Sequence, residues 1–229
     1  MSVRAPLVLI AVLAAGMAAC GEEESAPRTA ARTTAAPAAP EAAGELGRPA
    51  TVPATANIFG AGLAQPPEPG GGGAGVLPPG WRLPDGENRI LTVPHATGRV
   101  KPIDDYPAAN GPAGDKIGVT DVESYDGISG IAHRHNGMFL VGVFLTDERP
   151  AEPAPPSLDF TGRDRFDSLA PRIAQTFLIG NGRGRAFEVP AQATRLYVGF
   201  ADGYFYEGPP GWYGNNVGEL EVTVDMRRG

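Results

Sequence analysis

The sequence predicts an all-β fold, a single antiparallel β-sandwich. Short apolar runs rich in β-branched and aromatic residues recur along the chain. No apolar stripe of helical spacing reaches a useful length, and turn formers are spread throughout, with 32 Gly and 24 Pro. The seven predicted strands are RILTV (89–93), KIGVT (116–120), MFLVGVFL (138–145), TFLIG (176–180), AFEVP (186–190), RLYVGF (195–200) and ELEVTVDM (219–226).

Two of these runs indicate how deeply their strands are buried. In 219–226 the apolar and polar residues alternate strictly, which is typical of a strand with one face on the core and one in water. The run 138–145 is apolar throughout, so we expect a central strand that is covered on both faces.

The connections carry turn chemistry and little helix. GNGRG (180–184) lies between two predicted strands and is expected to be a hairpin turn. The glycine run 69–75 is expected to be a flexible crossing between strands. The best helix candidate is RDRFDSLAPRI (163–173), one or two turns that end at Pro171.

The N-terminus has the pattern of a secretory signal. Residues 1–19 contain one positive charge, Arg4, a short apolar stretch and small residues before Cys20. A small-residue box that ends in Cys resembles a bacterial lipobox, which implies cleavage before Cys20 and lipidation of Cys20. Gly21 after it favours the outer membrane if the cell is Gram-negative. The alternative is an ordinary secreted protein.

A tether is expected between this anchor and the folded part. Residues 20–54 hold the lipidated Cys and a segment of Ala, Pro, Thr and Glu with almost no large apolar residue, which predicts disorder. The β-sandwich domain is expected at residues 55–229. We expect it to meet the membrane through the lipid anchor only.

Composition excludes several kinds of site. Cys20 is the single Cys, so no disulfide and no Cys-based zinc site can form within the chain. The net charge of −7 argues against nucleic acid as a partner. No G-x-S-x-G motif occurs, and the glycine run lacks the Lys-Ser/Thr of a phosphate loop. We therefore expect a protein that is not an enzyme.

The candidate ligands lie towards the C-terminus. Ca²⁺ takes six to eight oxygens, and Asp202, Asn215 and Asn216 offer a carboxylate and two amides within a glycine-rich stretch. The simpler alternative is that the Asn pair forms a turn. Separately, His133 and His135 would share one face of a strand, a spacing that can hold a metal, although His133 is more readily the hydrogen-bonding wall of a site.

The stretch GWYGNNVGELEVTV (211–224) resembles the C-terminal segment of the calcium-dependent, galactose-binding lectin of Pseudomonas, and RLYVGFAD (195–202) resembles the strand before it. The resemblance implies a jelly-roll sandwich of galactose-binding-like type. It also implies Ca²⁺ coordinated by sugar hydroxyls and by the protein. The implied protein ligands are the side chains of Asp202, Asn215 and Asn216 and the carbonyls of Tyr125 and Trp212.

Residues 56–226 as a whole look like uncharacterised bacterial surface proteins of the PEP-CTERM kind, although this chain lacks their sorting tail. The chain also departs from the lectin. Asp202 lies further before Asn215 than in the lectin, so Glu207 is the alternative carboxylate ligand. The sugar-contacting residues of the lectin have no aligned equivalents, and His133 is one possible substitute.

Three functions follow as hypotheses. The first is a lipid-anchored, cell-envelope module that binds Ca²⁺ and a carbohydrate, with Trp212, Tyr213, Tyr204 or Phe205 stacking on the sugar. The second is a structural or adhesion protein of the envelope, and the third is the accessory domain of an envelope hydrolase. The oligomeric state cannot be read from the sequence.

Overall fold

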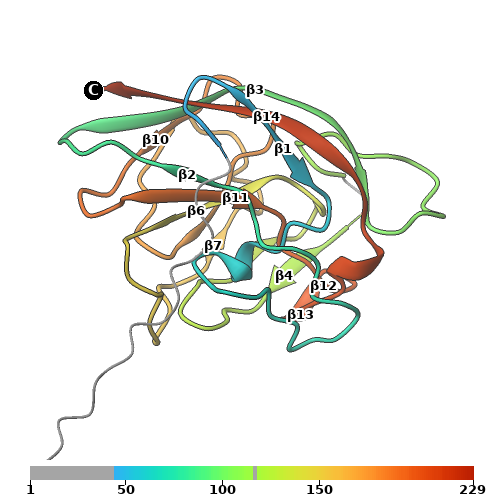
Figure 1. Cartoon of the computed structure of the whole chain (residues 1–229). Coiled ribbons are helices and arrows are strands. Elements are labelled where there is room, and N and C mark those ends of the chain that lie inside the picture. Colours follow the sequence, from blue (N-terminus) through green and yellow to red (C-terminus); the bar gives the residue numbers. More distant parts are fainter. Residues whose placement is uncertain (1–43, 116–117) are drawn as a thin grey trace, which may run out of the picture. The chain divides into compact units, whose positions relative to one another are not determined.

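Two long strands form the centre of the first sheet in the computed structural model, which describes residues 44–115 and 118–229. β3 (Arg89–Lys101) and β14 (Val217–Arg228) pair antiparallel along their length (Figure 1). The sheet has the order β1-β14-β3-β10-β8. Its other strands are β1 (Pro49–Pro53), β10 (Ala186–Glu188) and β8 (Ser168–Leu169).

The second sheet contains the apolar run that the sequence predicted to be central. Its order is β2-β11-β6-β9, and all five residues of β6 are buried. This confirms the prediction, because β6 lies between two strands and is covered on both faces. The strands are β2 (Gly80–Arg82), β6 (Val141–Leu145), β9 (Thr176–Leu178) and β11 (Arg195–Gly199).

A third sheet of short strands carries the candidate site at one edge. Its order is β12-β13-β4-β5-β7. The strands are β4 (Thr120–Val122), β5 (Ile131–His133), β7 (Leu158–Asp159), β12 (Gly203–Tyr204) and β13 (Glu207–Pro210). Two short 3-10 turns, η1 (Ile58–Gly60) and η2 (Tyr213–Asn215), are the helical elements of the described chain.

The first and second sheets pack face to face through aromatic rings. Phe177 of β9 lies 5.0 Å from Phe144 of β6 and 4.9 Å from Phe187 of β10, measured between ring centroids, so it joins the two sheets. All three rings are fully buried, and each such burial stabilises the fold by about 1.5–3 kcal/mol. The predicted all-β sandwich is confirmed.

Several local predictions are wrong. Residues 180–184 do not close a hairpin, because β9 pairs with β6 in the second sheet and β10 pairs with β3 in the first. They carry the chain from one sheet to the other. The helix expected at 163–173 is absent, and this segment contributes the two-residue strand β8. The sandwich is not purely antiparallel, since β8, β13 and β7 each pair in parallel with a neighbour.

The folded domain begins earlier than residue 55. β1 pairs with β14 from Pro49↔Thr223 to Pro53↔Glu219, and the Gly44 amide donates to the Gly80 carbonyl. The expected tether therefore has to end before Gly44, because a disordered segment could not make these pairings. The predicted signal, Cys20 and the remainder of the tether lie outside the described residues. Within the described residues, no helix is long and apolar enough to cross a bilayer.

Candidate functional site

Four of the five predicted calcium residues, all except Tyr125, lie on a crossing between the two main sheets. β11 ends at Gly199 and β14 begins at Val217, and the chain between them folds into the β12–β13 hairpin and η2. The two ends of this segment lie close together, so that the side chains of Asp202 and Asn216 form a hydrogen bond. The long separation of the two residues in sequence is therefore accommodated by the hairpin.

Asp202 is a buried carboxylate, with only 3% of its surface exposed. Its Oδ1 accepts a hydrogen bond from the Gly203 amide at 2.8 Å, and its Oδ2 accepts one from Asn216 Nδ2 at 2.8 Å. Both donors are neutral. Burial therefore dominates and raises the pKa of Asp202 to about 7, and the two hydrogen bonds offset only part of that rise.

Tyr213 supports the site from the protein interior and offers no exposed ring for stacking. Its ring is fully buried, and its hydroxyl donates to the Phe200 carbonyl at 3.0 Å. The same hydroxyl accepts from the Asp202 amide at 3.0 Å. The prediction that Tyr213 stacks on a sugar is wrong, because the residue holds the backbone of Asp202 from inside the domain.

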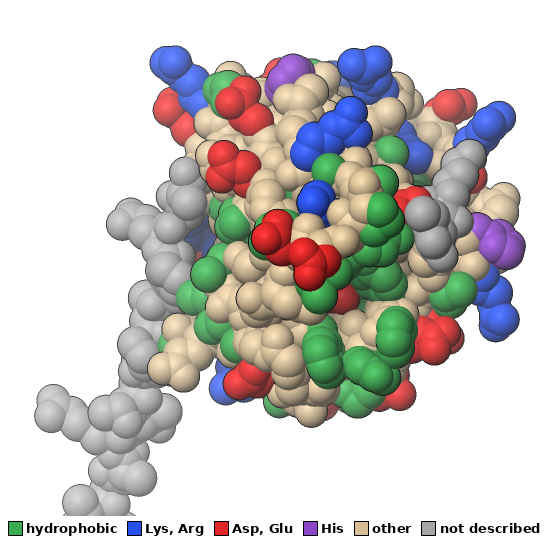
Figure 2. All heavy atoms as spheres, turned by 90° about the vertical axis from the view of Figure 1, so that its right-hand side faces the viewer, with side chains coloured by type: hydrophobic (Ala, Val, Ile, Leu, Met, Phe, Trp, Pro, Cys, Tyr) green, Lys and Arg blue, Asp and Glu red, His purple; other side chains and the backbone are tan. Residues whose placement is uncertain are grey.

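A pocket of about 300 Å³ opens beside Asp202. We call it the Asp202 pocket; it is lined by Pro102, Ile103, Tyr106, Asp202, Gly203, Tyr204, Phe205, Tyr206, Trp212 and Asn215. Figure 2 faces the side of the molecule that carries β12, and hydrophobic side chains gather in the lower part of that face. The pocket thus combines an apolar wall with one carboxylate and one amide.

Three aromatic rings form a continuous surface on this wall. Tyr204 lies 4.5 Å from Phe205 and 5.0 Å from Trp212 between ring centroids. Tyr204 is 58% exposed and Phe205 is 76% exposed, the largest values among the exposed large hydrophobic residues described. Water therefore reaches rings that a folded protein normally buries, which is a mark of a binding surface.

The same residues have unfavourable backbone conformations. Phe205, Tyr206 and Trp212 have φ values of 53°, 64° and 66°, in the left-handed region. A bulky residue is uncommon there, and such strain costs about 1–3 kcal/mol per residue. Phe205 and Tyr206 occupy the hairpin positions that Asn-Gly usually fills. Strained residues of this kind cluster at functional sites, so they mark the pocket as a candidate site.

The backbone of the glycine run 69–75 packs against Trp212 and forms hydrogen bonds with its segment. The Trp212 amide donates to the Gly71 carbonyl at 2.7 Å, and the Tyr213 amide donates to the Gly73 carbonyl at 3.0 Å. A Cβ on Gly72 would lie 2.4 Å from Trp212 Cδ2, so only glycine fits there. The expected flexible crossing is instead hydrogen-bonded to the site, and its glycines permit the close approach.

Three polar atoms at the site are buried and have no hydrogen-bond partner: Trp212 Nε1, Asn215 Oδ1 and Asn216 Oδ1. Such atoms are rare in native proteins, and each is a place where a water, an ion or a ligand is expected. Trp212 and Asn215 line the Asp202 pocket and Asn216 contacts Asp202, so the three unpartnered atoms belong to residues at or next to one candidate site.

The residues expected to bind Ca²⁺ come together only in part. Asp202 and Asn215 line the pocket, Asn216 contacts Asp202, and the two amide oxygens are unpartnered, so these three fit a hard cation. Tyr125 is not among the lining residues, and its carbonyl accepts from the Ile128 amide at 3.0 Å. Trp212 is a lining residue, and its ring lies 5.0 Å from that of Tyr204 between centroids.

The alternative residues lie elsewhere. Glu207 is exposed on β13 and is not a lining residue, so Asp202 is the carboxylate of the pocket. His133 lies on β5, where burial lowers its pKa, and its Nδ1 accepts from the His135 amide at 3.4 Å. Neither is part of the site. Among the described residues, no group of three or more His, Cys, Asp or Glu could hold a metal ion.

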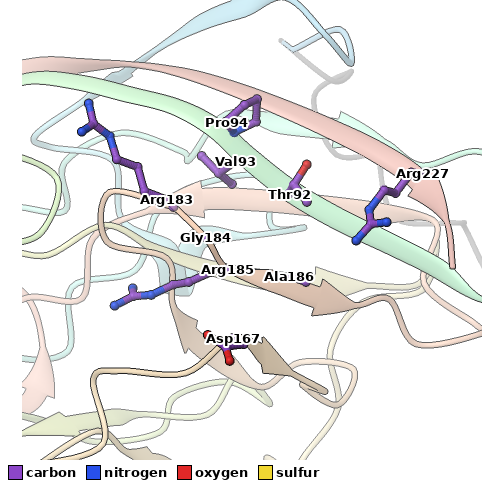
Figure 3. Close-up of a pocket in the computed structure, with 10 residues that line it drawn as sticks. Thr92, Val93, Pro94, Asp167, Arg183, Gly184, Arg185, Ala186 and Arg227 are labelled. Atoms are coloured by element: carbon purple, nitrogen blue, oxygen red, sulfur yellow. The ribbon is translucent and has the colours of Figure 1, made fainter.

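A second hollow, of about 490 Å³, is lined by residues of β3 and of the turn that leads into β10 (Figure 3). It is lined in part by Arg183, Arg185 and Arg227, but these side chains extend in different directions. Arg185 is already used, because its Nη1 donates to the Ile179 carbonyl at 2.7 Å and its guanidinium lies 4.7 Å from the Phe166 ring centroid. The arginines therefore do not converge on one ligand.

Sequence reasoning missed half of the wall. Tyr206 directly follows Tyr204 and Phe205 in sequence, and this adjacency is a signal from which its place in the wall could have been predicted. Tyr106 and Ile103 come from the segment after β3, about 100 positions earlier, and no local pattern links them to the site. No protein-family model matches the chain, and no curated protein matches it significantly.

Proposed function

We propose that the protein is a carbohydrate-binding module of the bacterial cell envelope. The observation that carries the proposal is the continuous aromatic surface of Trp212, Tyr204 and Phe205 beside Asp202 and Asn215 in one pocket. The apolar face of a sugar ring would stack on the aromatic rings, and its hydroxyl groups would donate to the carboxylate and amide oxygens.

Ca²⁺ is the proposed cofactor. Asp202, Asn215 and Asn216 would hold it and supply part of the six to eight oxygens, and sugar hydroxyls would complete the shell. Lipidation of Cys20 would attach the module to the envelope, a part of the proposal that rests on the sequence alone.

The experiment is a Ca²⁺ titration of the purified full chain by calorimetry, followed by a glycan array with and without Ca²⁺. We expect binding heat, a higher melting temperature and Ca²⁺-dependent glycan signals. Asn215→Ala should abolish them, while Asn181→Ala, which alters a turn outside the pocket, should not. No heat at millimolar Ca²⁺ and no glycan signal would overturn the proposal.

A second candidate is an adhesion or structural protein. The exposed Tyr204 and Phe205 with the neighbouring Ile103, which is 45% exposed, would also suit a protein partner. As an accessory domain of a hydrolase the chain would only bind the substrate, because the described lining residues of the Asp202 pocket include one carboxylate whereas glycoside hydrolysis uses two.

A further inference from the structure

The Asp202 carboxylate is buried without a positive charge to balance it. Its two hydrogen bonds come from neutral groups, and no Lys, Arg or His is among the lining residues. Within the described chain, no ion pair involves Asp202. A buried charge without a partner is unfavourable, so an occupant of this pocket gains from carrying a positive charge.

The walls around this carboxylate are aromatic. Five of the ten lining residues have aromatic rings: Tyr106, Tyr204, Phe205, Tyr206 and Trp212. The face of such a ring is electronegative and attracts a cation within about 6 Å of its centroid. A metal ion would use the carboxylate and gain little from apolar walls, whereas a neutral sugar would use the walls and leave the carboxylate unbalanced.

We propose that the Asp202 pocket binds an organic ammonium group of the choline type, with its charge facing Asp202 and its methyl groups packed on the rings. The inference goes beyond the proposed function, since it depends on the pocket and not on a sugar. An amine-bearing glycan would combine this inference with the sugar-binding part of the proposed function, with the ammonium group in the place of Ca²⁺ at Asp202.

The size of the pocket and the surrounding charge fit this ligand. A volume of about 300 Å³ is at the lower end for ligand pockets, which suits a compact headgroup. Asp104 and Asp105 are exposed in the segment that supplies Ile103 and Tyr106 to the wall, and the chain has a net charge of −7. The resulting negative potential attracts cations to this site.

The test compares choline with 3,3-dimethyl-1-butanol, its uncharged isostere, on the purified full chain in EDTA at constant ionic strength. Calorimetry measures affinity, and tryptophan fluorescence reports the site, because Trp212 lines the pocket while Trp81 is fully buried elsewhere. We expect choline to bind at least about 10-fold more tightly than the isostere, in line with a desolvated cation–π contact and a nearby carboxylate.

Asp202→Asn should remove this preference, whereas Glu207→Gln, which removes an equal charge outside the pocket, should keep it. Tyr204→Ala is a second probe, because its ring is 58% exposed and its loss should not unfold the domain. We expect it to weaken choline binding by about 10-fold.

Equal affinity for the two isosteres, or no choline binding, would overturn the inference. A panel of neutral sugars, measured separately at millimolar Ca²⁺ without EDTA, separates the two proposals. Sugar binding without a choline preference would leave only the proposed function, and choline binding without sugar binding would leave only this inference.

Discussion

Two buried charges of this protein have opposite surroundings. Arg89, 4% exposed, donates four hydrogen bonds from its two Nη atoms to backbone carbonyls, at 2.7–2.9 Å. The acceptors belong to Pro84, Pro190, Ala191 and Ala193. Asp202, 3% exposed, accepts two hydrogen bonds from neutral donors.

The difference separates a structural charge from a functional one. Four carbonyl dipoles replace most of the water that the Arg89 guanidinium loses, although its Nε has no partner. Three of the four carbonyls lie in the loop after β10, so they tie β3 to that loop. Only two hydrogen bonds from neutral donors compensate the loss of water around the Asp202 carboxylate, and Asp202 lines a pocket. Arg89 is thus satisfied mostly by the fold itself, whereas Asp202 is left for the cation that we propose as its ligand.

Arg89→Met should destabilise the domain by about 3–5 kcal/mol, because it removes four hydrogen bonds and leaves their carbonyls unpaired. Urea unfolding measures the change. Arg228→Met is the matched control, since Arg228 pairs with Arg89 in register on β14 but is exposed, and it should cost less than about 0.5 kcal/mol. Equal losses would mean that the carbonyl cluster contributes nothing.

Asp202→Asn should stabilise the ligand-free protein at pH 8. The folded-state pKa of about 7 lies above the ordinary value of 3.8, so the folded state holds this proton more tightly than the unfolded chain. Its contribution is therefore fully present below about pH 4 and is lost as pH rises to about 7. The loss reaches about 4 kcal/mol as an upper bound, since one pKa unit corresponds to about 1.4 kcal/mol.

Denaturant unfolding of the wild type and the variant at pH 5 and pH 8 measures this effect. The nearby Tyr206 and Tyr213 have pKa values raised by burial and remain uncharged in this range. We expect the variant to gain more stability relative to the wild type at pH 8 than at pH 5, by about 2–3 kcal/mol as an upper bound. The same difference at both pH values would contradict the account.

The contrast also shows what the sequence can predict. Strict alternation in 219–226 and the apolar run 138–145 report burial directly, and both strands are confirmed. The sequence singles out Asp202 and the Asn pair because their side chains offer oxygens of the kind that Ca²⁺ takes, and the structure brings Asp202 and Asn216 into contact. The four carbonyl partners of Arg89 follow from backbone geometry, which no residue pattern encodes.

Other parts depend on contacts between distant segments. The hairpin expected at 180–184 was wrong because a glycine turn looks the same whether it closes one sheet or joins two. Tyr125 was placed at the site by resemblance, but its carbonyl is used in a local turn. The short strands β12 and β13 have too few residues to show a period, although they shape the pocket.

Gly72→Ala should weaken choline binding by about 10-fold or more, because the added Cβ collides with Trp212 and displaces its ring. Gly71→Ala is a close control. Both glycines have φ of 73°, so both variants have the same backbone strain, but a Cβ on Gly71 meets no atom within 4 Å. Calorimetry measures the choline affinity of the two variants. An equal loss of affinity in both would show that backbone strain, and not displacement of the Trp212 ring, weakens binding.

Phe205→Asn should increase stability by about 0.5–1 kcal/mol, because Asn tolerates the left-handed conformation better than Phe and little packing is lost from a side chain that is 76% exposed. The same variant should bind ligand a few-fold more weakly. Thermal melts and calorimetry measure the two effects. A less stable variant would show that Phe205 supports the fold and is not strained for function.

The most direct measurement is a crystal structure of the protein with 2-bromoethyl-trimethylammonium, in which anomalous scattering from bromine marks the ligand. The account predicts the trimethylammonium group between Trp212, Tyr204 and the Asp202 carboxylate, with the bromine at the mouth of the pocket. An empty Asp202 pocket at saturating ligand, with Asp202 still bonded only to Gly203 and Asn216, would contradict it.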